Sequence, residues 1–118
     1  MLEQLHGATV FIADREVAND RDAVDAIAAA HYEHGADFLV LPVDKLPADF
    51  FRLKSGIAGA IVQKFVDYHM RLAVMGDVEE HAAGSTSFRD WVREANRGKH
   101  IWFVTDLADL SERLAAQQ

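Results

Sequence analysis

Aspartate follows each of four short apolar runs in the sequence. Asp14, Asp44, Asp77 and Asp106 stand just beyond the ends of these runs. If the runs are parallel strands, their carboxyl ends meet at one edge of a sheet, where open α/β sheets bind ligands. Clustered carboxylates can hold a cation such as Mg²⁺ or divide into a general acid and a general base. Aspartate also caps helices, and capping is the simpler interpretation, so we assign no metal site and no cofactor.

A second candidate is a serine in an unusually glycine-rich segment, Leu53-Lys54-Ser55-Gly56-Ile57-Ala58-Gly59. Gly56 and Gly59 each cost roughly 1 kcal/mol inside a helix, so something must offset them. If a helix begins at Ser55, after a separate turn, the amides of residues 56–58 point outward. Such a helix start, with Lys54 beside it, can receive an anion or carry a phosphoserine. The alternative is that small residues let the helix pack closely on the sheet.

A row of arginines stands on another predicted helix. Arg89, Arg93 and Arg97 are four residues apart, and Asn96 lies next to the last of them. Arginine forks suit carboxylates and phosphates, so the row is a candidate contact for an acidic partner or a small anion. Acidic residues on the same helix offer local pairing, which favours a solvated, partly paired face.

The signatures of several enzyme classes are missing from the sequence. No G-x-S-x-G, H-E-x-x-H or P-loop pattern occurs, and there is no cysteine for thiolate chemistry or disulfides. His31 and His34 are three residues apart on a predicted helix, but no metal-binding motif surrounds them. The sequence therefore favours a binding module over an enzyme.

Apolar runs and helical periods indicate the elements that position these residues. Runs at 8–13, 38–41, 72–75 and 101–104 are continuous rather than alternating, which is typical of strands covered on both faces. Each precedes a segment with helical periodicity, and these segments are 20–34, about 48–70, 88–97 with Ser87 as its cap, and 107–116. The alternation predicts a single α/β domain, in two or three layers, with a mainly parallel sheet of four or five strands.

The order of the strands also follows from crossover rules and the resemblance described below. We expect the order 2-1-3-4 for the four main runs. Leu2–Leu5 is a candidate edge strand, either turned back through His6-Gly7 onto the first run or placed beside the second. Residues 79–86 are predicted to form a surface loop.

Composition limits the partners and the compartment. The chain has 118 residues, of which 50% are hydrophobic, and a formal net charge of −7. One domain covering residues 1–118 is expected at this length. The negative charge disfavours nucleic acids and anionic membranes, and no apolar run is long enough for a membrane span. The start of the chain has no signal-peptide pattern, so we expect the cytoplasm.

The sequence resembles a bacterial family known as domain of unknown function 4180, and the likeness covers about the whole chain. It is carried by Phe50-Phe51, Leu53 to Gly59, Gln63-Lys64-Phe65, Arg71 to Asp77, Phe88-Arg89-Asp90 and Glu94 to Gly98. More loosely, the succession of strand, Ser-Gly-apolar, long helix and Leu-Ala-Val-Met-Gly is similar to STAS domains, the anti-sigma-factor antagonists. That resemblance implies a mixed sheet backed by helices. It also implies phosphorylation of Ser55, at the start of the second helix, as a switch of partner binding.

Three hypotheses about function therefore stand beside one another. The preferred one is a regulatory binding module with Ser55 as its switch and a protein or small anion as its partner. The second is an anion- or Mg²⁺-dependent enzyme that uses strand-end aspartates and Lys54. The third is a structural or homodimeric domain, because Trp102 and Phe103 adjoin on a strand expected at the sheet edge.

Overall fold

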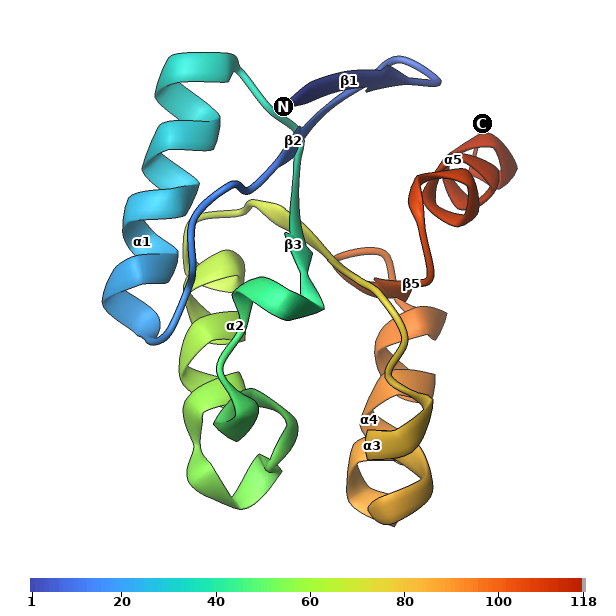
Figure 1. Ribbon diagram of the computed structural model, residues 1–118. Helices are drawn as coiled ribbons and strands as arrows, with labels where there is room; N and C mark the ends of the chain where they lie inside the picture. Colours follow the sequence, from blue (N-terminus) through green and yellow to red (C-terminus); the bar gives the residue numbers. More distant parts are fainter. Residues whose placement is uncertain (118) are drawn as a thin grey trace.

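The computed structural model describes residues 1–117, which form one five-stranded sheet with helices on both faces (Figure 1). The order across the sheet is β1-β2-β3-β4-β5. β1 is antiparallel to β2, and the remaining neighbours are parallel, which confirms the predicted mainly parallel α/β architecture. The strands are β1 (Leu2–Leu5), β2 (Ala8–Ile12), β3 (Phe38–Pro42), β4 (Arg71–Met75) and β5 (Ile101–Val104).

The main helices lie where the sequence predicted them, but several of them begin or end at other residues. The α-helices are α1 (Asp20–Ala28), α2 (Ile57–Asp67), α3 (Glu79–Gly84), α4 (Thr86–Arg97) and α5 (Leu107–Ala116). The bounds of α5 are as predicted, and α1 continues into a π-helical turn, Ala29–Glu33. The supposed loop at 79–86 contains α3, and the cap of α4 is Ser85 rather than Ser87. Across residues 1–117, no helix has both the length and the apolar character of a membrane span.

The predicted strand order was wrong, because the main runs follow one another in sequence order across the sheet. The cause is the hairpin at the start of the chain. A two-residue turn at His6-Gly7 places Leu5 opposite Ala8, so β1 occupies one edge of β2. Only one edge of β2 is then left for a parallel neighbour, and β3 takes it. Leu2–Leu5 thus lies beside the first run, as one of the two alternatives had it, and not beside the second.

Sequential order decides how the layers form. Right-handed crossovers that all advance in one direction put their connecting helices on the same face of a sheet. α1, α2 and α4 accordingly share one core with the sheet, which includes Leu39, Leu72 and Phe103. The second face packs against α5 through Leu110 and Leu114. Figure 1 shows α5 apart from the other helices.

Trp102 is the centre of the face that α5 covers. Two guanidinium groups lie over its ring, with Arg71 Cζ 4.8 Å and Arg113 Cζ 4.9 Å from the ring centroid. The indole Nε1 donates a hydrogen bond to the carbonyl of Gly98 at 2.8 Å. Trp102 and Phe103 are only 3% and 7% exposed, so these side chains do not form the exposed dimer contact that their place in the sequence suggested.

Two histidines adopt left-handed backbone conformations, which are usually found at glycine or asparagine. His6 (φ +49) precedes Gly7 (φ +85) in the β1–β2 turn, where Asn-Gly is the favoured pair. His69 (φ +57) follows α2, and its amide donates to Val66 while the next amide, of Met70, donates to Phe65. This hydrogen-bond pattern is a Schellman motif, whose left-handed position is normally glycine. Each histidine therefore costs roughly 1 kcal/mol of backbone strain.

Replacing His69 with glycine is expected to raise the free energy of unfolding by about 1 kcal/mol, because glycine adopts this conformation without a Cβ clash. Urea denaturation followed by circular dichroism measures the change. His69→Ala is the matched control: it also removes the imidazole but keeps the Cβ, so it gains no stability. Equal stability of His69→Gly and His69→Ala contradicts the assignment of strain to this residue.

Candidate functional site

The chain between β3 and α2 forms an irregular corner, residues 48–59, which we call the Ser55 corner. Ala48–Phe51 and Leu53–Ser55 are two short 3-10 turns, and α2 follows at Ile57. Pro47 precedes the first turn with φ −71°, the angle that its ring imposes. The predicted helix at 48–70 is therefore split, with a separate turn before its start.

Two buried aromatic residues anchor this corner to the neighbouring helices. Phe50 and Phe51 are 0% and 8% exposed. The ring of Phe51 stacks on His81 of α3 with 4.1 Å between centroids, and the ring of Phe50 lies 5.8 Å from Trp91 of α4. Phe50 and Phe51 thus fix the backbone of the corner to the core, while the polar residues of the corner are exposed to solvent.

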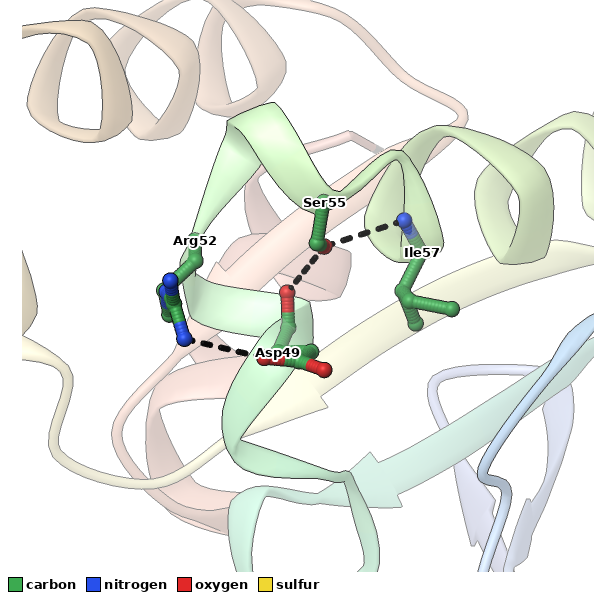
Figure 2. Close-up of polar contacts among 4 residues, drawn as sticks. All are labelled: Asp49, Arg52, Ser55 and Ile57. Carbon is green, nitrogen blue, oxygen red and sulfur yellow. Dashed lines mark hydrogen bonds and ion pairs between the residues drawn. The ribbon is translucent and has the colours of Figure 1, made fainter.

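Ser55 joins the two halves of the corner through its hydroxyl group (Figure 2). Its Oγ donates to the carbonyl oxygen of Asp49 at 2.6 Å and accepts from the amide of Ile57 at 3.2 Å. Asp49 also pairs with Arg52, with Nη1 and Oδ1 3.4 Å apart. Ser55 is nevertheless exposed, so a structural hydrogen-bonding group lies where an enzyme can reach it.

The backbone bends at Gly56, as the sequence suggested, but its amides are not free. Gly56 has φ +80°, which glycine tolerates, and α2 begins one residue later rather than at Ser55. The amide of Gly56 donates to the carbonyl of Leu53 at 3.2 Å, and that of Ile57 donates to Ser55. The expectation that the amides of residues 56–58 point outward is therefore wrong for the first two.

Gly59 has no packing role in the structure. A Cβ atom built on Gly59 or on Gly56 meets no atom within 4 Å, and both residues are exposed. The close helix–sheet packing that offered an alternative explanation for these glycines is therefore wrong. Gly56 is explained by its left-handed backbone, whereas the conformational cost of Gly59 has no compensation within the described chain.

The positive side chains predicted as an anion contact are spread along exposed surfaces. Lys54 and Arg89 are exposed, and no hydrogen bond or ion pair of either is found within residues 1–117. Arg89 follows Phe88, whose ring lies 5.9 Å from Phe51, so it borders the Ser55 corner. Further along α4, Arg97 pairs with Glu94, with 2.9 Å between Nη1 and Oε1.

Asn96, a candidate binding residue, makes structural hydrogen bonds to the sheet and to α5. Its Oδ1 accepts a 2.7 Å hydrogen bond from the amide of Phe103, on the outer edge of β5. Arg113 of α5 donates to the Asn96 carbonyl at 3.2 Å. Asn96 thus ties α4, the edge strand and α5 together, far along α4 from the Ser55 corner.

The four strand-end aspartates do not gather into one site. Asp77 accepts a hydrogen bond from the amide of Glu79, and Asp106 caps α5 by accepting from Asp109. Asp14 and Asp44 are exposed on the loops after β2 and β3. In the part of the chain that the structure describes, no three histidine or carboxylate side chains lie close enough to hold a metal ion.

The sequence analysis missed a cavity at the opposite edge of the sheet, where β2, β3 and β4 begin. It has a volume of about 880 Å³, and its lining includes Arg71, Asp37 and three histidines, His6, His31 and His69. Burial lowers the pKa of Arg71, while the charge of Asp37 acts in the opposite direction. Histidines at turn positions that favour glycine or asparagine were the available sequence signal, but only the fold brings them together.

Gly59→Ala is expected to stabilise the protein by about 0.5–1 kcal/mol, because alanine is the better helix former and its Cβ enters open space. Chemical denaturation provides the measurement. Gly56→Ala is the matched control, and it should destabilise the protein by roughly 1–2 kcal/mol because a Cβ is unfavourable at positive φ. A loss of stability in Gly59→Ala would mean that this glycine has a structural role after all.

Asn96→Ala should destabilise the protein by about 1–3 kcal/mol, because it leaves the Phe103 amide without its acceptor. Thermal and urea unfolding measure the loss. Asn96→Asp preserves a side-chain oxygen at the same place and should retain most of the stability. If Asn96→Ala and the parent protein unfold alike, the hydrogen bond to β5 contributes nothing.

Comparison with known proteins confirms the resemblance of the sequence to domain of unknown function 4180. Residues 4–114 match the family described as Domain of unknown function (DUF4180). Neither the search of curated proteins nor the search of solved structures finds a match. Since the match covers nearly all of the described residues, the chain belongs to the DUF4180 family.

Proposed function

We propose that this protein is a regulatory binding module of the bacterial cytosol. In this proposal the Ser55 corner contacts a protein partner, and phosphorylation of Ser55 controls the contact. The observation that carries it is Ser55, an exposed residue whose hydroxyl closes the corner through hydrogen bonds to Asp49 and Ile57.

Phosphorylation at this position changes both hydrogen bonding and charge. A phosphate ester on Oγ has no O–H, so the carbonyl of Asp49 loses the donor that it has now. The new group adds about −1.5 to −2 charges next to the start of α2 and near the cations of Arg52 and Lys54. The exchange of a neutral donor for a multiply charged acceptor favours a rearranged corner, which is what a switch requires.

The surface beside Ser55 suits a protein partner better than a small anion. Gly56, Gly59 and Ala60 are exposed and small, so the backbone of a partner can approach the first turn of α2 closely. An anion at the same place needs free amides, whereas those of Gly56 and Ile57 already have acceptors. The cost of Gly59, which internal packing does not explain, then has a functional reason.

The proposal does not depend on likeness to STAS domains. It shares with them a serine near the start of the second helix, but the sequential strand order differs from the order that this likeness predicted. What supports a switch at Ser55 is the local geometry of the corner.

Protein purified from its native host should contain a fraction that is heavier by one phosphate. Intact mass spectrometry measures the fraction, and peptide mapping should assign the phosphate to Ser55. The Ser55→Ala protein, expressed from the same locus, is the control and should carry none. Absence of phosphate from Ser55 under all growth conditions tested would remove the switch from the proposal.

Cross-linking in the native host tests the contact surface. Ser55→Asp and Gly59→Arg should both abolish the cross-linked partner, the first by its charge and the second by its bulk. Ala108→Arg is the matched control on the other layer, at an exposed position of α5, and should retain the partner. If Gly59→Arg and Ser55→Asp cross-link to the same proteins as the parent, the Ser55 corner is not the contact surface.

A further inference from the structure

We propose that the cavity at the amino-terminal edge of the sheet binds a small aromatic acid, that is, a planar apolar molecule with a single carboxylate. This site lies at the edge opposite to the Ser55 corner and is independent of it. The inference rests on the shape of the cavity, on a fixed guanidinium group and on a histidine with an unfavourable backbone conformation.

The size and the walls of the cavity suit a small organic molecule. Its volume of about 880 Å³ lies within the range of ligand pockets, which run from roughly 300 to 1,000 Å³. The cavity reaches across the edge of the sheet, from Val24 and Ile27 of α1 on one layer to Leu114 of α5 on the other. Ile27 and Leu114 are only 4% and 5% exposed, but Tyr32 and Tyr68 of the same lining are exposed, and their rings can stack on a planar apolar body.

Arg71 supplies a fixed positive charge at the start of β4. Its Nε donates to the carbonyl of Lys99 at 2.6 Å, and its Nη2 donates to Gln117 at 3.2 Å. The guanidinium also stacks on Phe38, with Cζ 4.3 Å from the ring centroid. Residues 1–117 provide no acceptor for Nη1, so part of the fork remains for a carboxylate, in an orientation that is already set.

Asp37, which also lines the cavity, limits how many negative charges the ligand can carry. Asp37 lies near Arg71, and its Oδ2 accepts a 2.8 Å hydrogen bond from the amide of Thr9. A fixed carboxylate repels a phosphate with two charges more strongly than a carboxylate with one. The pair therefore favours a singly charged ligand, and the second oxygen of Asp37 can accept from a hydroxyl or amine group on it.

His69 supplies an observation that a purely structural cavity leaves unexplained, whereas the ring of His6 lies within hydrogen-bonding distance of Ser111, with 3.0 Å between Nε2 and Oγ. His6 and His69 are the only residues other than glycine with positive φ in the described chain, and both line this cavity. They belong to unrelated turns, and at each one a more favourable residue is available. Residues that keep local strain collect at functional sites, so the strain at His69, an exposed residue of the cavity lining, points to a role for its imidazole toward a ligand.

Binding of 1-anilinonaphthalene-8-sulfonate, an aromatic molecule with one negative charge, tests the proposal on the folded chain. Fluorescence titration should show saturable one-site binding, and amide shifts in ¹⁵N-labelled protein should be confined to the lining of the cavity. The uncharged N-phenyl-1-naphthylamine has nearly the same body and should bind at least tenfold more weakly. Absence of saturable binding, equal affinity for the two probes or shifts elsewhere would each overturn the proposal.

Variants of His69 and Gly59 distinguish an effect on ligand affinity from an effect on the stability of the fold. His69→Gly and His69→Ala should both weaken binding of the sulfonate at least threefold, although only the first stabilises the fold. Gly59→Ala, which stabilises the protein away from the cavity, should leave the affinity unchanged. If neither His69 variant alters the affinity, or if Gly59→Ala alters it as much as they do, the assignment of His69 to a ligand site is wrong.

Discussion

The constraint on which the rest of this structure depends is the handedness of its strand crossovers. Because the parallel strands advance across the sheet in one direction, right-handed connections place α1, α2 and α4 on the same face. The other face would be open to water without the last helix. Packing of α5, together with the stacking of Arg71 and Arg113 on Trp102, closes it and completes a three-layered protein.

The same constraint bears on the positions of the strand-end aspartates and of the cavity. Open α/β sheets bind ligands at a switch point, where the strand order reverses and two loops separate. A sequential order has no reversal, and the strand-end aspartates have local roles: Asp77 accepts from the amide of Glu79 in the turn before α3, and Asp106 caps α5. At the opposite edge, α1 and α5 belong to different layers, and the cavity extends across the edge between them.

The two candidate surfaces of the protein differ in how they are built. The hydrogen bonds of the Ser55 corner join residues close in sequence, since Ser55 bonds to Asp49 and Ile57, while Phe50 and Phe51 anchor the corner in the core. The cavity depends on distant segments, because Arg71 meets the side chain of Gln117, and His6 lies 3.0 Å from Ser111 of α5. The polar contacts of the corner therefore form locally, whereas a cavity between layers requires that the whole fold be intact.

The sequence by itself determined the elements that depend on local interactions. Continuous apolar runs specified the four parallel strands, and Asp106 and the periodic leucines specified α5. It also located the bend at Gly56, where a positive φ favours glycine. Only the tertiary structure decided the strand order and the cavity with Arg71 and the histidines. These features arise from pairing and packing between segments far apart in the chain, and local propensity carries no information about such contacts.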